Sequence, residues 1–298
     1  MSPQSSYKNV HRRLAEERRK DSRTTEELIK LALLPDEDVS SDALAALWYR
    51  PPETMLEIAR QLSTSHDDGE RILAARILGQ GGIPVPERFP FDSTLPRLLS
   101  MVERETDPEV LSVICVALGN VNDDIGDPQA IEALLRLKNH PDKEVRLAVV
   151  QALLFQSGKP AVDALVELSN DQDRDVRDWA TFGLAQVEDV DTPAVRDVLW
   201  ARANDDDPDI RGEALVGLAK RADVGVIELL LQELDEVHSD VGSVLFEAAV
   251  EAGKRLYDLR LCQALSYLQT LNSHFGYDDD LRQALDRCKS KQTGQTPE

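Results

Sequence analysis

A repeated pattern of apolar and polar positions runs through most of the chain. In the clearest copies an Asp is followed by Val or Ile at the fourth position, Arg at the fifth, and small or apolar residues at the eighth, eleventh and twelfth. We number the positions of each copy as slots. The clearest copies are DKEVRLAVVQALL (142–154), DRDVRDWATFGLA (173–185) and DPDIRGEALVGLA (207–219). Weaker copies begin at residues 36, 67, 107 and 238, so first slots lie 31 to 40 residues apart, a spacing typical of repeated helical hairpins.

Each copy predicts one amphipathic helix, because slots four, eight, eleven and twelve share a face of a 3.6-residue helix. We call this the B helix. A second apolar pattern, the A helix, precedes every copy: EELIKLALL, TMLEIARQL, TLPRLLSMV, AIEALLRLK, AVDALVELS, AVRDVLWAR and VIELLLQEL. No stretch shows the alternation typical of a strand. A single hairpin cannot bury its apolar face, so neighbouring hairpins must stack, and alanine and glycine on the B helices would let them approach closely.

The predicted fold is therefore all-α, an α-solenoid of about seven helical hairpins with helical caps. We expect a basic leader or cap helix at 1–23, the solenoid at 24–255, capping helices at 256–289 and a flexible tail at 290–298. The long connection at 81–93 has two interpretations: Phe89 and Phe91 pack against the stack, or the loop contacts a partner.

Composition supports a stack of repeats and adds a charge argument. Aromatic residues make up only 5% of the chain, which is few for two ordinary cores. There are 55 acidic and 34 basic residues, a net charge of −21, and residues 1–23 carry +4, so the remainder carries −25. Residues 171–209 contain twelve acidic and four basic residues. This sign disfavours nucleic acid and favours a basic partner protein.

The remaining chemistry-bearing residues give no motif. Cys115, Cys262 and Cys288 fit neither a disulfide framework nor a zinc spacing, so we expect three reduced thiols. The five histidines are scattered and have no recurring Cys or carboxylate partner. No apolar signal segment or membrane span is evident. We expect a non-enzymatic cytoplasmic protein that binds no metal, cofactor, nucleic acid or membrane and is a monomer when free.

The pattern D-x-x-V-R-x-x-A-x-x-x-L resembles the HEAT repeat in the short bacterial form called phycobilin-lyase-like. Four segments within 140–250 also resemble bacterial HEAT-repeat proteins encoded beside Rhs-type toxins, which are regarded as their immunity proteins: VRDWATFGLA (176–185), TPAVRDVLWAR (192–202), DIRGEALVGLAKRAD (209–223) and LLLQEL (229–234). The resemblance implies a non-catalytic solenoid that neutralises a basic toxin domain. The alternatives are a phycobilin-lyase-like or other enzyme-accessory subunit, or a general interaction scaffold.

Two sets of slots supply the candidate functional residues. The first set is a predicted ladder of ion pairs between stacked repeats, formed by slot-five arginines and slot-one aspartates: Arg71, Arg146, Arg177, Arg211, Asp107, Asp142, Asp173 and Asp207. The second set is a predicted protein-binding surface where the acidic charge is greatest: Asp175, Asp178, Trp179, Phe182, Asp209 and Glu213. Trp179 and Phe182 lie outside the apolar stripe, so they either fill space between repeats or anchor a partner.

Overall fold

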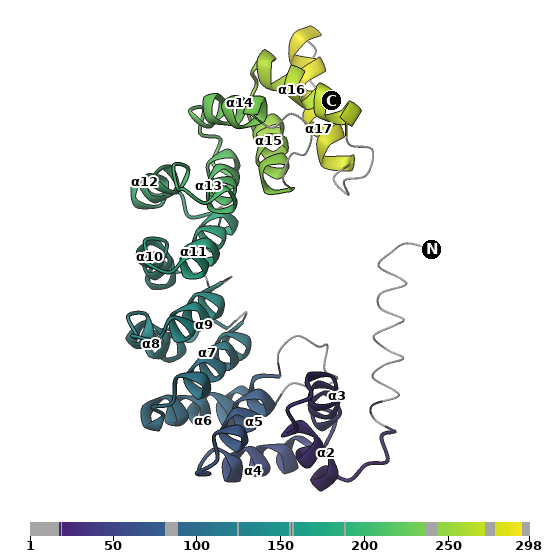
Figure 1. Ribbon diagram of the computed structural model, residues 1–298, viewed down its shortest axis with the longest axis vertical. Helices are drawn as coiled ribbons and strands as arrows, with labels where there is room; N and C mark the ends of the chain where they lie inside the picture. The colour runs from purple at the N-terminus through teal and green to yellow at the C-terminus, as the bar shows by residue number, and fades with distance from the viewer. Residues whose placement is uncertain are drawn as a thin grey trace. The chain divides into compact units, whose positions relative to one another are not determined.

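The computed structural model describes residues 18, 20–80, 89–123, 125–154, 156, 158–187, 189–236, 243–271 and 278–293. In these residues all regular structure is helical, with sixteen helices labelled α2 to α17 and no strand (Figure 1). Most of the basic leader, residues 1–17 and Arg19, lies outside the described residues. The prediction of an all-α solenoid is confirmed.

Every predicted A and B segment forms one helix. The A helices are α2 (Thr25–Ala32), α4 (Pro52–Leu62), α6 (Phe91–Arg104), α8 (Pro128–Leu137), α10 (Lys159–Leu168), α12 (Pro193–Arg202) and α14 (Val226–Glu236). The B helices are α3 (Glu37–Leu47), α5 (Asp68–Gly79), α7 (Pro108–Asn122), α9 (Lys143–Leu153), α11 (Arg174–Gln186), α13 (Pro208–Lys220) and α15 (Ser243–Arg255). Two more helices follow, α16 (Leu259–Leu271) and α17 (Asp278–Thr293).

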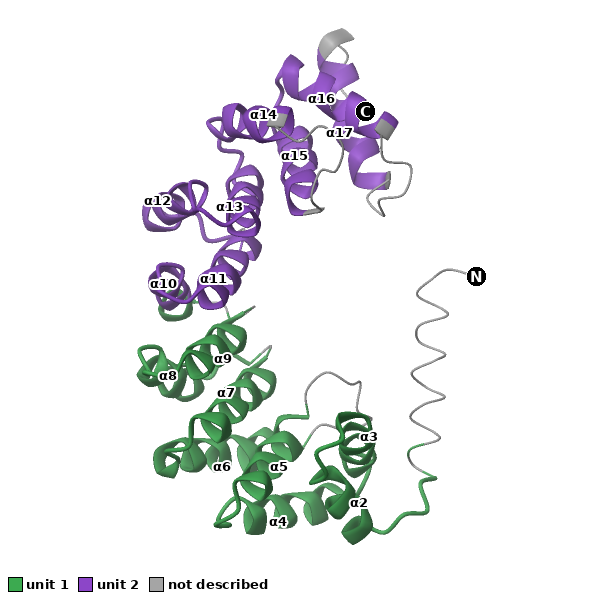
Figure 2. Cartoon of the chain, viewed as in Figure 1, with its two compact units in different colours: residues 1–161 green, residues 162–298 purple. Residues whose placement is uncertain are grey.

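The chain divides into two compact units, Met1–Ala161 and Val162–Glu298 (Figure 2). In the first unit α5 packs on α7 and α7 packs on α9. In the second unit α11 packs on α13, α13 packs on α15, and α15 packs on α17. Consecutive B helices are therefore direct neighbours within each unit, and the functional slots of one repeat lie beside those of the next.

The slot-one aspartates begin the B helices. Each is the N-cap of its helix, and its side-chain carboxylate accepts a hydrogen bond from a backbone N–H of the first turn: Asp36, Asp67, Asp107, Asp142, Asp173 and Asp207. Such a cap contributes typically about 1 kcal/mol to helix stability. The repeated Asp thus fixes where each B helix starts.

Small residues set the packing of consecutive B helices. At three junctions slot thirteen of one helix meets slot eleven of the next, with no room for another carbon atom: Gly79 with Ala117, Gly119 with Ala152, and Ala185 with Gly217. A Cβ added to Gly119 would lie 2.6 Å from Cα of Ala152. Two junctions in the first unit and one in the second therefore share one register.

The structure corrects the prediction for two of the three cysteines. Cys262 in α16 and Cys288 in α17 form a disulfide, with their Cα atoms 5.8 Å apart, so the capping helices are covalently joined. Sequence spacing gave no sign of this pair, because the pairing depends on how α16 and α17 pack together. Cys115 is free and buried in α7, and burial raises the pKa of its thiol to about 12.

The structure also bears on the predicted C-terminal tail and on the long connection at 81–93. Helix α17 continues to Thr293, so residues 290–293 are helical, while 294–298 lie outside the described residues. In the long connection, residues 81–88 lie outside the described part of the chain. Phe89 is buried, and its backbone N–H donates to the Gln80 side chain at 2.7 Å, as the packing interpretation expects. Phe91 begins α6 and is half-buried.

We expect the disulfide to stabilise the C-terminal cap. Cys262→Ala/Cys288→Ala should lower the free energy of unfolding by about 3 kcal/mol, since the bond closes a loop of 26 residues. Urea unfolding without reductant measures the loss, and hydrogen exchange should place it in α16 and α17. Reductant should destabilise the wild-type chain equally and leave the double variant unchanged. Three free thiols in the unreduced, unfolded chain would contradict the bond.

Candidate protein-binding site

The acidic charge of the chain is concentrated in the second unit. Residues 162–298 contain 29 acidic and 14 basic residues, a net charge of −15, whereas residues 1–161 contain 26 and 20, a net charge of −6. All six predicted binding residues belong to the second unit and lie on α11 and α13. These two helices pack on each other.

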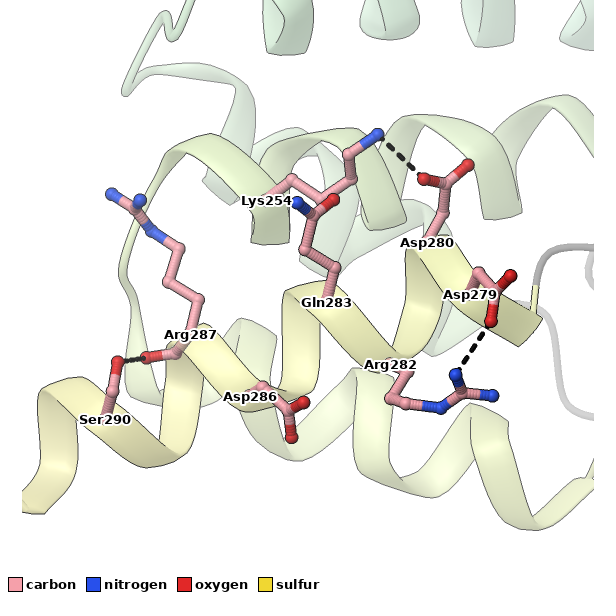
Figure 3. Close-up of a pocket in the computed structure, with 8 residues that line it drawn as sticks. All are labelled: Lys254, Asp279, Asp280, Arg282, Gln283, Asp286, Arg287 and Ser290. Atoms are coloured by element: carbon pink, nitrogen blue, oxygen red, sulfur yellow. Dashed lines mark hydrogen bonds and ion pairs between the residues drawn. The ribbon is translucent and has the colours of Figure 1, made fainter. Parts of the chain in front are cut away.

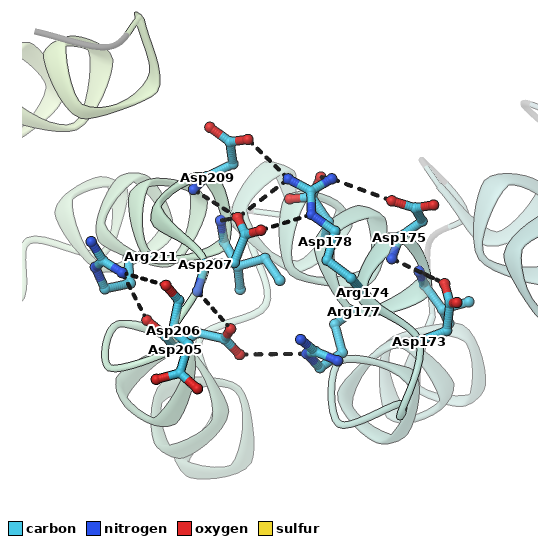
Figure 4. Close-up of polar contacts among 12 residues, drawn as sticks. Asp173, Arg174, Asp175, Arg177, Asp178, Asp205, Asp206, Asp207, Asp209 and Arg211 are labelled. Carbon is cyan, nitrogen blue, oxygen red and sulfur yellow. Dashed lines mark hydrogen bonds and ion pairs between the residues drawn. The ribbon is translucent and has the colours of Figure 1, made fainter.

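One arginine organises the acidic groups of these helices (Figure 4). Arg174, at slot two of α11, contacts Asp175 and Asp178 on its own helix, each at 3.3 Å. Its guanidinium also reaches Asp207 at 2.8 Å and Asp209 at 2.9 Å at the start of α13. Four carboxylates share a single cation, so the five side chains keep a net charge of −3.

Arg174 does not satisfy these carboxylates equally. Its hydrogen bonds lower the pKa of Asp207 to about 2, helped by backbone N–H groups of α13. Asp178 is half-buried, and its pKa is raised, because burial and the charges of Asp209, Asp207 and Asp175 outweigh Arg174. The site therefore has surplus negative charge at Asp178.

Burial and charge conflict at Glu213. It lies half-buried on α13 and has no hydrogen bond or ion pair with any residue that the structure describes. Burial first, and then the carboxylates of Glu247 and Asp178, raise its pKa to about 7. Lys220 opposes this shift only partly, since its ammonium donates to Gln186 at 2.9 Å and lies 3.9 Å from Glu247. A cation from outside would relieve the conflict.

An aromatic pair adjoins this charge. Trp179 and Phe182 of α11 pack edge to face, with ring centroids 5.7 Å apart and planes at 79°. Trp179 is 41% exposed, while Phe182 is half-buried. Trp179 and Glu213 occupy slot seven of α11 and α13, so they are equivalent positions on helices that pack together. The surface formed by Asp178, Trp179, Phe182, Asp209 and Glu213 is here called the acidic aromatic face.

The slot-five arginines hold the turns between A and B helices. Each donates to at least one backbone carbonyl five or six residues before it in the chain, in the turn that leads into its own helix: Arg71, Arg146, Arg177 and Arg211. Arg177, for example, donates to the carbonyls of Asp171 and Gln172 at 3.0 and 3.2 Å. These arginines are parts of the framework.

The ladder between repeats differs from the predicted one. Arg71 pairs with Glu105 at 2.7 Å and Arg177 with Asp205 at 3.5 Å, in each case two residues before slot one of the following B helix. The predicted partner was slot one itself, whose side chain is turned toward its own helix as the N-cap. Asp207 does join the preceding repeat, but through Arg174.

Sequence reasoning missed the central cation and one nearby anion. Arg174 could have been found, because it stands four residues before Asp178 on one helix, the spacing of side-chain ion pairs. Glu247 could not, because its influence on Glu213 depends on the packing of α15 on α13.

The hollow between α15 and α17 is less suited to a ligand that brings charge. A groove of about 640 Å³ between α15 and α17 is lined by Lys254, Asp279, Asp280, Arg282, Gln283, Asp286, Arg287 and Ser290 (Figure 3). Four of its six charged side chains are paired with one another, Lys254 with Asp280 at 3.1 Å and Arg282 with Asp279 at 2.7 Å. Across the described residues there is no group of three or more His, Cys, Asp or Glu placed to hold a metal, and no helix with the length and apolar character to span a membrane.

Stacked A and B helices joined by capped turns define an α-solenoid repeat protein. The family model of HEAT repeats matches residues 95–185 and 162–252, together more than half of the chain. The chain belongs to the HEAT repeat family.

Solved structures agree with this fold. The YibA protein of Escherichia coli is 22% identical, with a TM-score of 0.72 over 93% of this chain and 95% of that protein. Yeast importin-β, Kap95p, is 13% identical, with a TM-score of 0.53 over 89% of this chain, which spans 41% of the importin. A structure of Kap95p binding RanGDP gives a TM-score of 0.51 at 12% identity, covering 89% of this chain and 41% of that one. No curated protein sequence matches the chain.

Glu213 should make stability depend on pH. Its pKa is about 7 in the folded chain and near 4.5 when unperturbed, so the folded state holds the proton more tightly. Stability should therefore fall as pH rises from about 4.5 to about 7 and remain lower above it. Glu213→Gln removes this loss and should raise the free energy of unfolding at pH 8 by roughly 1–2 kcal/mol, allowing for partial solvent screening, with little change at pH 5.

Urea unfolding at pH 5 and pH 8 measures this difference. Glu144→Gln on α9 is the matched control, because Glu144 is an exposed carboxylate at slot three. If Glu213→Gln and Glu144→Gln change stability equally at both pH values, Glu213 is not held in a conflict of burial and charge.

Proposed function

We propose that this chain is a non-catalytic binding protein that holds a basic segment of a partner protein on the acidic aromatic face. The observation that carries the proposal is Glu213, a half-buried carboxylate without a partner among the described residues and surrounded by other carboxylates. It lies on the helix that packs beside α11, which bears an exposed tryptophan. Burial and neighbouring negative charges disfavour the ionised form of this carboxylate, and a bound cation would stabilise it.

The two kinds of side chain on the face have different roles in binding. An Arg or Lys of the partner pairs with Glu213 and Asp178. Its positive charge is attracted by the negative charge that Arg174 does not neutralise. Trp179 supplies apolar contact and an aromatic surface over which a guanidinium can stack, a contact worth about 0.5–2 kcal/mol. The net charge of −15 on the second unit accelerates encounter with a basic partner.

A protein partner fits this face better than a nucleic acid or a cofactor. Both units carry net negative charge, which repels phosphate backbones. The Kap95p structure with RanGDP is a precedent for protein binding by a solenoid of this fold.

We further propose that the partner is a basic toxin domain and that binding neutralises it. Support comes from the resemblance of segments 176–185, 192–202 and 209–223 to HEAT-repeat immunity proteins, because these segments include all five residues of the acidic aromatic face. A phycobilin-lyase-like or other enzyme-accessory subunit, and a general scaffold, are the alternatives. Bilin absorbance that persists on the chain after gel filtration would favour the lyase-like alternative.

A labelled basic peptide tests the binding face directly. We expect the full chain to bind a fluorescein-labelled peptide of alternating Arg and Leu, with an affinity that falls between 50 and 200 mM salt. Trp179→Ala should weaken binding about 30-fold, the loss typical of a central anchor. Fluorescence anisotropy measures both effects.

The matched control is Tyr267→Ala, which removes another exposed aromatic side chain of the same unit, on α16. It should leave the affinity unchanged. Equal binding by Trp179→Ala and Tyr267→Ala, or equal binding of an alternating Glu and Leu peptide by the wild-type chain, would refute the proposed face.

Co-expression tests the toxin proposal separately. The chain should restore growth to cells that express the C-terminal domain of a toxin encoded beside it, and Glu213→Lys should abolish this protection, because it reverses charge at the centre of the face. Tyr267→Ala should protect as the wild-type chain does. Absence of protection by a wild-type chain that still binds the basic peptide would reject toxin neutralisation and leave the binding face standing.

A further inference from the structure

A second surface with a different chemical character lies on the B helices of the first unit. A groove of about 400 Å³ runs over α3, α5 and α7 and is lined by Leu44, Trp48, Ala75, Arg76, Gly79, Val113, Val116, Ala117 and Asn120. No acidic residue is among those that line it, although the chain has 55. Its only charged lining residue is Arg76.

The groove follows from the small-residue packing of the B helices. Gly79 meets Ala117 so closely that an added Cβ would lie 2.9 Å from that of Ala117. Neither residue has a longer side chain, so the surface above this contact is left hollow. Val113 and Val116 of α7 are half-buried and form one side. Trp48 forms the other side, held because its indole N–H donates to the carbonyl of Arg76 at 3.2 Å.

Arg76 gives the groove its charge. Its side chain is half-buried and makes no hydrogen bond or ion pair with any residue in the described part of the chain. Arg71, five residues earlier on α5, is by contrast paired with Glu105 and Asp68. An arginine that is held without a partner beside apolar side chains favours a ligand that brings both a carboxylate and an apolar group.

The walls of the groove narrow the choice of ligand. The groove is formed by the last turns of α3 and α5 and by the interior of α7. The backbone N–H groups there are used within the helices, so no backbone donors point into the groove. Free C-terminal carboxylates are typically captured by clusters of such N–H groups. A side-chain carboxylate that pairs with the fork of an arginine needs none of them.

We propose that this groove is a docking site for an amphipathic helix of a partner protein, one that places a large apolar side chain and, one turn away, an Asp or Glu. The apolar side chain enters between Val116 and Trp48, and the carboxylate pairs with Arg76. A helix presents both groups on one face at a spacing of three or four residues. This site is separate from the acidic aromatic face and does not rest on its function.

The test uses the full chain and a fluorescein-labelled helical peptide with Leu and Glu four residues apart and an amidated C-terminus. We expect binding that Arg76→Glu weakens at least tenfold and Val116→Asp weakens similarly, measured by fluorescence anisotropy. Arg76→Lys should retain part of the affinity. The control is Arg136→Glu, which reverses the charge of an exposed arginine on α8 of the same unit and should bind as the wild-type chain does.

Arg76→Glu should fold normally, since the guanidinium has no partner to lose among the described residues, and circular dichroism checks this. Trp179→Ala should bind the acidic peptide unchanged, which separates the groove from the acidic aromatic face. No binding of the peptide, tighter binding of its Lys and Leu counterpart, binding that requires a free C-terminal carboxylate, or equal losses in Arg76→Glu and Arg136→Glu would each overturn the proposal.

Discussion

Contact between glycine and alanine on consecutive B helices is the constraint on which the rest of the structure depends. Slot thirteen of one helix meets slot eleven of the next at the Gly79, Gly119 and Gly217 junctions, where an added Cβ would lie 2.6 to 3.1 Å from its neighbour. Overpacking of this kind typically costs about 1–3 kcal/mol. One shared register brings equivalent slots of neighbouring repeats side by side and turns separate helices into continuous surfaces.

The repeated polar residues maintain that register and are therefore poor candidates for ligand contacts. The slot-one Asp caps its own helix, and the slot-five Arg ties down the preceding turn, as Asp173 and Arg177 show. The side chains that vary from repeat to repeat are free to specify chemistry. In the second unit they create the acidic aromatic face, and in the first an apolar groove with Arg76 at its side.

The sequence predicts the fold well because the repeat encodes it locally. Helix starts, apolar stripes and the order of A and B helices all follow from residues close together in the chain, such as Asp142 followed by Val145 and Val149. The sequence also singles out Trp179 and Phe182 as candidates, since they break the apolar pattern of α11. What it leaves open depends on contacts between helices. The Cys262–Cys288 bond, the four partners of Arg174 and the influence of Glu247 on Glu213 all need the packed register.

If the proposed function is right, the half-buried carboxylate of Glu213 on the acidic aromatic face forms an ion pair with a cation of the partner. Calorimetric titration of the full chain with the basic peptide at pH 7, repeated in buffers of different ionisation enthalpy, tests it most directly. With a pKa of about 7, Glu213 is about half protonated before binding, so the account predicts release of about half a proton, abolished in Glu213→Gln. Binding that releases no proton, or releases as much from Glu213→Gln, would contradict the account.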